Sequence, residues 1–416
     1  MPKRLPISLL LALALVLAAV LASSAPAAAK QAKGKQRLSR IADARELAPR
    51  SCRARARAAA RRSRRNPSAR RNPQARRRIA KRIRSCRRGA TDSGGPRVPL
   101  YWGASIGEQL TGTQAPWDMG AVAEFEGLAE KQVSLINFFA PFANCADPSA
   151  CYHYKFAKGP MENIRRHGAI PVFSWSSQSI PSKLDEPDFQ LSDVLEGHHD
   201  SYIRSFAEEA RDWGHPFFLR FNWEMNGTWF PWSEGVNGNR PGEFVAAWRH
   251  VHDIFEQVGA SNATWVWCPN IDPSRDFQDL SSLYPGDEYV DWTGLDGYNW
   301  GAGKAAWASF DSLYRSTYDE ITGTIAPSKP LLIGEMGSSE RGGSKAEWIT
   351  DALESIPTSY PKIRAMLWFD TFDDGMDWPI ETSASAAGAF ASAIQDPAYR
   401  TNSYAELGPE TIAPPS

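Results

Sequence analysis

The stretch Pro216-Phe-Phe-Leu-Arg-Phe-Asn-Trp-Glu224 is a mostly apolar run that ends in a carboxylate. A second run, Pro330-Leu-Leu-Ile-Gly-Glu335, has the same form. Short apolar runs of this kind are typical of parallel strands that are buried on both faces. Because a carboxylate is costly to bury without a partner, two of them at the ends of such runs indicate a functional site. The two runs therefore predict a parallel sheet with acidic chemistry at the carboxyl ends of its strands.

The region around these two runs alternates apolar strands with amphipathic helices, such as those expected over Ser201–Trp213 and Gly242–Val258. Eight strands with intervening helices over roughly 300 residues predict one (β/α)8 barrel, an α/β fold, over residues 98–400. A doubly wound open sheet is the competing fold, but no Gly-rich phosphate loop follows the first strand. The expected strands are Pro99–Ser105, Val133–Phe139, Ile170–Trp175, Pro216–Phe221, Thr264–Cys268, Trp292–Leu295, Leu331–Gly334 and Ile363–Phe369.

The charge of the chain is divided sharply between two segments. Residues 30–97 contain 25 Lys and Arg against 3 acidic residues, whereas residues 98–416 contain 20 against 44. The basic segment has few large apolar residues, so it is expected to be helical or flexible, without a core of its own. Such a segment either binds an anionic cell-surface polymer or acts as a solvated spacer. We expect no specific nucleic-acid partner.

The two ends of the chain are predicted to lie outside the barrel. Residues 1–29 resemble a signal peptide, with basic Lys3 and Arg4, an apolar stretch over Leu9–Leu21 and small residues up to Ala29. This pattern predicts a secreted, extracellular protein, with an uncleaved N-terminal anchor as the alternative. No later stretch is long and apolar enough to predict a membrane span. Residues 401–416 are expected to form a C-terminal tail, and the protein is expected to be a monomer.

The five cysteines fit an oxidising compartment. Cys145 and Cys151 bracket a short loop and are predicted to pair, and Cys52 with Cys86 are a second candidate pair. Cys268 lies in an apolar run, where a buried free thiol is more common than a nucleophile. The spacing of Cys and His matches no zinc site. We therefore expect neither a metal nor a cofactor.

Glu224 and Glu335, the carboxylates at the ends of the two apolar runs, are suited to cleaving a glycosidic bond. At a barrel mouth they would face each other, one protonating the leaving oxygen and the other attacking the anomeric carbon. The proton donor needs a raised pKa, whereas the attacking group must stay ionised. Arg220 is expected to point to the same side as Glu224, since the two differ by four positions on one strand. A nearby arginine would keep the attacking carboxylate ionised.

Aromatic and amide side chains gather near the predicted strand ends. The chain has sixteen Trp, and Trp229 and Trp232 lie in a loop where we expect them to stack on the apolar faces of sugar rings. Trp265 lies inside a strand and is expected to be core. Asn222 and Asn270 follow strands and are candidates for hydrogen bonds to sugar hydroxyls.

Four of these strand ends together resemble glycoside hydrolase family 26. The resemblance covers roughly residues 98–400, and its motifs agree in order and spacing. They are Arg220-Phe-Asn-Trp-Glu-Met-Asn-Gly-Thr-Trp229, Gly294-Leu-Asp-Gly-Tyr-Asn299, Ile333-Gly-Glu-Met-Gly337 and Met366-Leu-Trp-Phe-Asp370.

The resemblance implies a role for each matching residue. Glu224 would be the acid/base and Glu335 the nucleophile, with Tyr298 touching the nucleophile and Trp368 forming the floor of the −1 sugar site. Trp223 stands where typical mannanases of the family have a histidine that contacts the sugar. Trp223 is then a flat wall of the substrate site, which leaves the identity of the sugar open.

The family's activities imply a secreted, retaining endo-hydrolase of a β-linked polysaccharide, with β-1,4-mannan as the first expectation. Mixed-linkage β-glucan and β-1,3-xylan are the alternatives within the family. A barrel that binds glycan without cleaving it is the alternative from another class of proteins.

Overall fold

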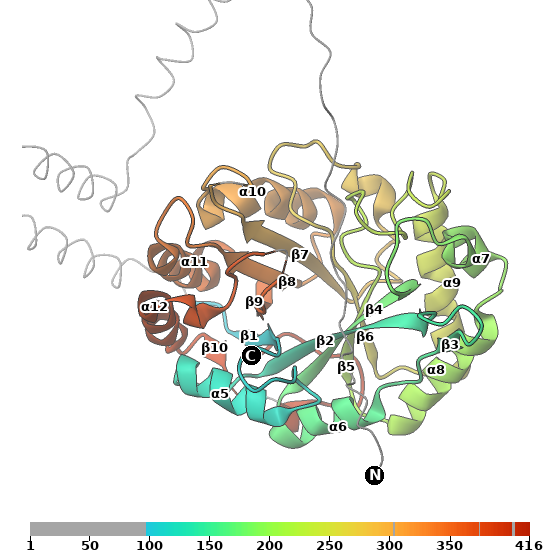
Figure 1. Ribbon diagram of the computed structural model, residues 1–416, viewed down its shortest axis with the longest axis horizontal. Coiled ribbons are helices and arrows are strands. Elements are labelled where there is room, and N and C mark those ends of the chain that lie inside the picture. Colours follow the sequence, from blue (N-terminus) through green and yellow to red (C-terminus); the bar gives the residue numbers. More distant parts are fainter. Residues whose placement is uncertain (1–96, 303, 374, 402–403) are drawn as a thin grey trace, which may run out of the picture. The chain divides into compact units, whose positions relative to one another are not determined.

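The computed structural model describes residues 97–416 except 303, 374 and 402–403 (Figure 1). The predictions made for the signal peptide, for nearly all of the basic segment and for the Cys52–Cys86 pair lie outside the described residues.

Eight parallel strands form a closed barrel, which confirms the predicted (β/α)8 fold. Neighbouring strands pair in chain order, and β1 pairs with both β2 and β9, which closes the ring. The short strands β3 (Tyr152–His153) and β10 (Tyr399–Arg400) extend the sheet beside β2 and β1. The barrel strands are β1 (Leu100–Ile106), β2 (Leu135–Asn144), β4 (Ile170–Ile180), β5 (Phe217–Phe221), β6 (Ala263–Trp267), β7 (Trp292–Asn299), β8 (Leu331–Ser338) and β9 (Ile363–Asp370).

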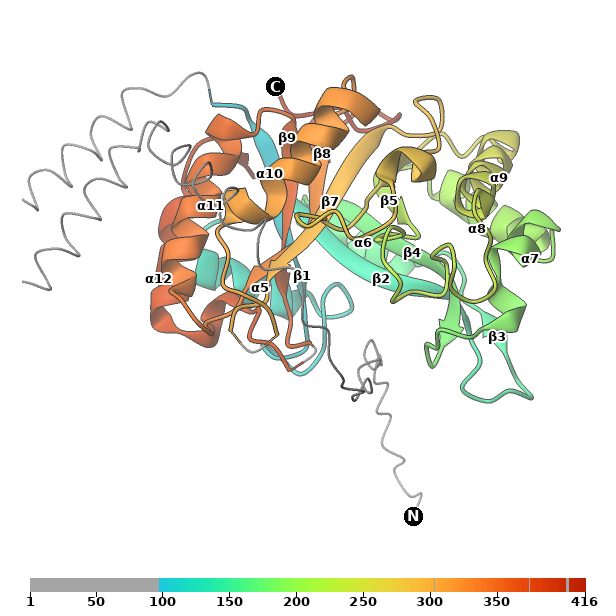
Figure 2. The same ribbon diagram turned by 90° about the horizontal axis from the view of Figure 1, so that it is seen from above.

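Helices surround the strands, with α10, α11 and α12 on one side of the barrel and α8 and α9 on the other (Figures 1 and 2). The α-helices are α5 (Met119–Ala129), α6 (Lys158–His167), α7 (Leu191–Leu195), α8 (Asp200–Trp213), α9 (Glu243–Val258), α10 (Phe310–Glu320), α11 (Lys345–Ser359) and α12 (Ala384–Ile394). Shorter helical turns are η2 (Pro187–Phe189), η3 (Leu280–Leu283), η4 (Ile321–Ile325), η5 (Ile380–Thr382) and η6 (Tyr404–Glu406).

Helix α8 illustrates how the sequence builds this layer. Ile203, Phe206 and Ala210 recur at helical spacing and are buried, so one face of the helix packs against the sheet. Phe206 stacks on Trp175 of β4 with ring centroids 4.3 Å apart. The helix ends at Trp213, and the φ of 71° at the following Gly214 suits a residue without a Cβ.

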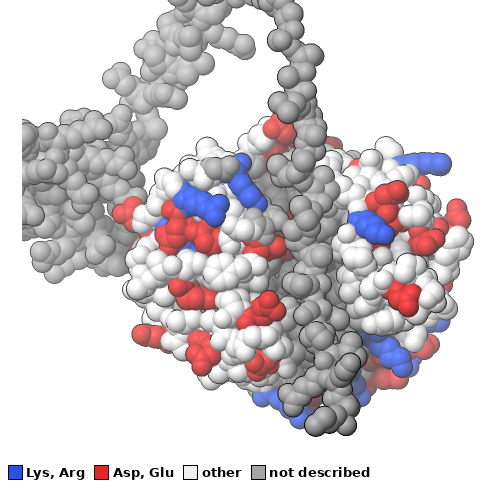
Figure 3. Space-filling view, in the orientation of Figure 1, with Lys and Arg blue, Asp and Glu red and all other residues white. Residues whose placement is uncertain are grey.

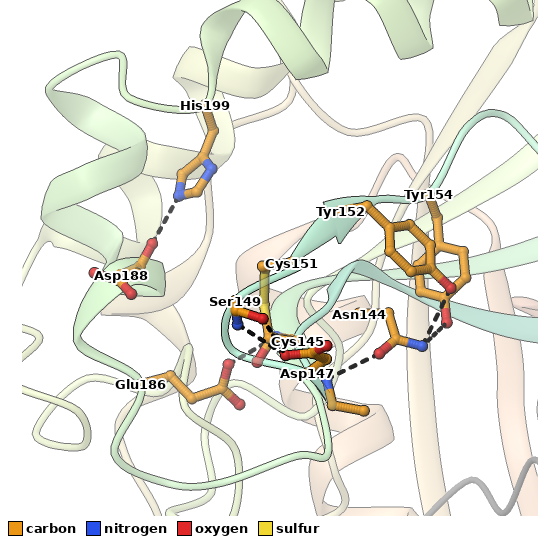
Figure 4. Close-up of a disulfide and its surroundings, with 12 residues drawn as sticks. Asn144, Cys145, Asp147, Ser149, Cys151, Tyr152, Tyr154, Glu186, Asp188 and His199 are labelled. Carbon is orange, nitrogen blue, oxygen red and sulfur yellow. Dashed lines mark hydrogen bonds between the residues drawn. A yellow bond between two sulfur atoms is a disulfide. The ribbon is translucent and has the colours of Figure 1, made fainter.

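A disulfide closes the loop that joins β2 to β3, which confirms the predicted pairing of Cys145 with Cys151 (Figure 4). Beside it, the amide of Asn144 donates hydrogen bonds to the hydroxyls of Tyr152 and Tyr154, at 3.3 and 3.1 Å. The loop is therefore fastened both covalently and by hydrogen bonds at the carboxyl end of β2.

The C-terminal residues return to the barrel. The Trp292 indole donates to the carbonyl of Ile412 at 2.8 Å, and the Ile412 amide donates to the Thr264 hydroxyl at the same distance. Within the described residues, we find no helix whose length and apolar character would let it cross a membrane.

Candidate active site

The carboxylate of Glu335, on β8, is held by two donors from neighbouring strands. The Arg220 guanidinium, from β5, donates to Glu335 Oε1 at 2.8 Å. The hydroxyl of Tyr298, from β7, donates to Glu335 Oε2. Burial raises the pKa of Tyr298 well above its usual range, so the phenol keeps its proton and acts as a donor. Glu335 therefore faces two groups that stabilise a negative charge.

Arg220 is also hydrogen-bonded within a fully buried polar cluster. The guanidinium also donates to Asp296 of β7 and, at 3.0 Å, to the Ser174 hydroxyl of β4. Burial raises the pKa of Asp296 well above its usual range, whereas the charge of Arg220 opposes this rise. The Cys268 thiol contacts Asp296 Oδ1 at 3.2 Å, and burial raises its pKa as well, so the predicted free buried thiol is confirmed.

Glu224 follows β5 and lies in a different environment. Its side chain accepts hydrogen bonds from the Trp229 indole at 2.6 Å and from the Asn270 amide at 2.7 Å. Both donors favour the ionised form, but burial outweighs them, and the nearby charge of Glu335 adds to the effect of burial. Together they raise the pKa of Glu224 to about 7. Glu224 is thus suited to hold a proton near neutral pH.

The backbone around Glu224 adopts an uncommon conformation. Asn222 and Glu224 have φ values of 43° and 54°, in the left-handed region that side chains with a Cβ seldom adopt. The Glu224 amide is fixed by a 2.7 Å hydrogen bond to the carbonyl of Cys268. Such conformations persist where the surrounding contacts determine them, and they cluster at functional sites. Since β5 ends at Phe221, this turn, rather than strand alternation, brings Glu224 toward Glu335.

Aromatic rings pack around Tyr298, whose hydroxyl donates to Glu335. Tyr298 packs against Trp378 and Phe369, with centroids 4.7 and 5.7 Å away, and Trp378 packs against Trp300 at 5.0 Å. Phe369 is within 6.4 Å of Phe139. Trp378 is among the Trp residues that follow a predicted strand end, whereas no sequence signal points to Phe369. Phe369 lies within β9, where the pairing register decides its direction, whereas the position of Trp378 depends on the loop after β9.

The prediction that Trp368 forms the floor of a sugar site is wrong in this structure. Trp368 pairs with Met336 across β8 and β9, and paired residues of parallel strands share a side, so both lie opposite to Glu335. Its ring packs against Trp348 of α11 and Phe390 of α12 and is 0% exposed. The neighbouring Phe369 takes the inward position.

Two further aromatic predictions are corrected by burial. Trp223 is 2% exposed and packs between Phe139, Phe230 and Trp232, with the Arg220 guanidinium over its ring. It supports Arg220 and leaves almost no face for a sugar. Trp232 is fully buried, and its indole donates to the carbonyl of Trp223.

Of the other residues predicted to contact sugar or to form the core, some lie in the site and some are structural. Trp229 is 38% exposed beside Glu224, so it remains available for a sugar ring. Asn222 exchanges two hydrogen bonds of 2.8 Å with Ser177 and is a structural residue, whereas Asn270 binds Glu224. Trp265 is core, as predicted. Within residues 97–416, as far as they are described, no group of three His, Cys, Asp or Glu side chains could hold a metal ion.

In this (β/α)8 barrel, one glutamate follows the fourth strand and has a raised pKa, and a second glutamate on the seventh strand is held by an arginine and a tyrosine. This is the architecture of a class of glycosidases. Comparison with known sequences agrees, because residues 151–377 match Glycosyl hydrolase family 26. The chain belongs to this family.

Individual relatives carry different names. Endoglucanase H of Acetivibrio thermocellus is 32% identical over 280 residues, which are 66% of this chain and 29% of that protein. A mannan endo-1,4-β-mannosidase of Bacillus subtilis is 28% identical over 239 residues, 55% of this chain and 60% of that protein. The chain thus spans less than two thirds of the length of either relative.

Among solved structures, the catalytic domain of an endo-β-1,4-mannanase from Bacillus sp. JAMB-750 superposes with a TM-score of 0.56 at 18% identity. The alignment covers 78% of this chain and 93% of that one. At this identity the likeness supports the fold.

Proposed function

We propose that this protein is a retaining endo-hydrolase of a β-1,4-linked polysaccharide. The observation that carries the proposal is the asymmetry between its two glutamates. Glu335 receives hydrogen bonds from Arg220 and Tyr298, whereas Glu224 is buried with a pKa raised to about 7. A double displacement at an anomeric carbon requires a carboxyl group that can give up a proton and a second carboxyl group that can attack.

In the proposed reaction, Glu224 gives its proton to the leaving oxygen while Glu335 attacks the anomeric carbon and forms a glycosyl ester. Glu224 then takes a proton from the water that breaks this ester. The positive charge of Arg220 and the Tyr298 hydroxyl stabilise the Glu335 carboxylate before attack and when it leaves again. Trp229 holds Glu224 by its indole N–H and offers a partly exposed ring beside it.

β-1,4-Mannan is the first candidate substrate, in line with the mannanases among the family's members and with the mannanase relative. A gluco-configured β-glucan is the second candidate, and two observations favour it. The relative named Endoglucanase H aligns at 32% identity. Trp223, which is buried, replaces a polar residue that contacts the sugar in typical mannanases. Initial rates on mannohexaose, cellohexaose, mixed-linkage glucan and β-1,3-xylan would decide between these candidates.

The test of the proposed chemistry is Glu335→Ala. Turnover should fall by a factor on the order of 10⁴ or more, because the attacking group is lost. Azide added to this variant should restore turnover and give a glycosyl azide of inverted configuration, since azide occupies the vacated space. Glu208→Ala, on the exposed side of α8, is the control and should keep wild-type turnover. A Glu335→Ala variant with wild-type activity would exclude the assigned role.

The N-terminal residues suggest where the enzyme acts. We propose that residues 1–29 direct secretion and that residues 30–97 hold the enzyme on an anionic cell-surface polymer. The acidic catalytic region supports a separate role for the segment, because residues 98–416 have 44 acidic against 20 basic residues. Asp and Glu are spread over the face shown in Figure 3, with fewer Lys and Arg. Such a surface would be repelled by an anionic polymer.

Deletion of residues 30–97 tests this role. The mature chain should bind an anionic wall polymer in a sedimentation assay, less so as salt rises, and the truncated chain should not bind. Equal binding by both proteins would contradict the proposal. Analysis of the culture medium of a producing strain would show whether the chain is exported and cleaved.

A further inference from the structure

Lys345, the first residue of α11, is fully buried and does not contact Glu224 or Glu335 through any hydrogen bond described above. A charged lysine is rarely buried completely, because removing the ammonium from water is costly. The N-terminus of a helix increases this cost, since its exposed N–H groups carry partial positive charge. Burial lowers the pKa of Lys345 to about 8, although Asp377, Glu340, Asp370 and Glu381 oppose that effect. Its position therefore calls for a specific reason.

The ammonium of Lys345 fastens the loop that follows β9. It donates to the carbonyls of Asp377 at 2.5 Å, Trp378 at 3.0 Å and Pro379 at 2.6 Å, and to the Thr382 hydroxyl at 3.0 Å. Three consecutive carbonyls thus converge on one cation. The Trp368 indole donates to the same Trp378 carbonyl at 3.1 Å, so the backbone of Trp378 is held from two sides.

The ring of Trp378 carries this restraint to the catalytic pair. It packs against Tyr298 with centroids 4.7 Å apart and is 2% exposed. Gly337, two residues after Glu335, leaves room for both rings, because a Cβ there would lie 3.1 Å from each. The Tyr298 hydroxyl in turn donates to Glu335. A continuous set of contacts therefore leads from Lys345 through Trp378 and Tyr298 to Glu335.

We propose that Lys345 is a positioning residue, whose buried ammonium fixes Trp378 so that Tyr298 is held against Glu335. This inference rests on the proposed function. Small displacements of a reacting group are costly, since a shift of about 1 Å can lower a rate by about 10²-fold. The clamp thus contributes to turnover without touching the substrate.

Lys345→Met tests the clamp, because methionine has a similar length but cannot donate a hydrogen bond. Lys131→Met is the matched control. Lys131 lies after α5, before the start of β2, and also donates to backbone carbonyls, those of Ile394 at 2.8 Å and Asp396 at 3.2 Å. We expect Lys345→Met to lower kcat at least tenfold with KM within about twofold, and Lys131→Met to leave both unchanged. Equal kcat in the two variants would overturn the inference.

A double-mutant cycle with Tyr298→Phe separates positioning from general damage. If Lys345 acts through Tyr298, Lys345→Met should cost much less in the Tyr298→Phe background than in the wild type. Additive losses would contradict the proposed route. Lys345→Gln keeps N–H donors and should recover part of kcat. If Lys345→Met does not fold, Lys345→Gln replaces it in all comparisons.

Hydrogen exchange supplies a readout that needs no turnover. The amides of residues 376–378 and 380–382 should exchange faster in Lys345→Met than in Lys131→Met, and unchanged protection would refute the clamp. A wild-type protein that cleaves no glycan would refute the proposed function, while the exchange experiment would still decide whether Lys345 fastens this loop.

Discussion

Glu224→Gln is expected to stabilise the folded protein relative to the wild type, and increasingly so as the pH rises from about 4.5 to about 7. The pKa of Glu224 rises from 4.5 to about 7 on folding, mainly by burial and then by the charge of Glu335. Between these values the folded state holds a proton that the unfolded state has lost. The stability associated with that proton is complete below pH 4.5 and is lost as the pH passes through about 7. A glutamine side chain has no such dependence.

The magnitude follows from the size of the pKa shift. One pKa unit corresponds to about 1.4 kcal/mol, so the full shift is worth about 3 kcal/mol. The difference in unfolding free energy between variant and wild type should therefore grow by about 1.4 kcal/mol per pH unit and level off above pH 7. For a domain of this size, a difference of about 3 kcal/mol corresponds to a Tm difference of about 5 °C.

Urea unfolding of both proteins between pH 4 and pH 8.5 measures this difference directly. Both oxygens of Glu224 accept hydrogen bonds, so the glutamine amide meets a donor on one side, which adds a pH-independent offset. The slope, rather than the absolute value, is the quantity to compare. Glu208→Gln, at an exposed position of α8, should give a flat difference. A flat difference for Glu224→Gln as well would refute the raised pKa and with it the assignment of the proton donor.

Three further predictions concern activity and stability. The value of kcat/KM should fall as the pH rises above about 7, because Glu224 must carry its proton when the leaving group departs; a profile that stays level to pH 9 would contradict this. Replacing Cys145 and Cys151 by serine should lower the unfolding free energy by about 2 kcal/mol, measured by denaturant titration, since the bridge closes a short loop; an unchanged midpoint would show that the disulfide does not stabilise the fold. Arg220→Met should lower stability by about 3–5 kcal/mol and abolish turnover, because it leaves Asp296 and Glu335 without their shared cation; a stable and active variant would argue against this role.

The sequence predicts the barrel because each strand is an apolar run of its own, and amphipathic helices follow most of them. It also locates Glu224 and Glu335, because carboxylates directly after buried runs are conspicuous. The direction of a side chain is harder to predict, since it depends on the pairing register. Trp368 and Phe369 are adjacent, and only the pairing of Trp368 with Met336 shows that Phe369 is the inward residue.

Contacts between residues far apart in the sequence are also hard to predict from the sequence. Trp232 lies in a loop that contains Gly and Asn, which suggests exposure, yet it packs on Trp223. Lys345 looks like an ordinary first-turn residue of a helix, and its acceptors are more than thirty positions away. Each of these outcomes depends on how loops from different strands meet, which local pattern does not encode.

The central claim is that a glycosyl ester forms on one glutamate while the other transfers the proton. Proton NMR of the first product from a β-linked oligosaccharide, recorded before mutarotation, tests this claim most directly. Double displacement predicts that the β-anomer appears first and that the α-anomer follows only by mutarotation. Initial release of the α-anomer would show single displacement and would contradict the roles assigned to Glu224 and Glu335.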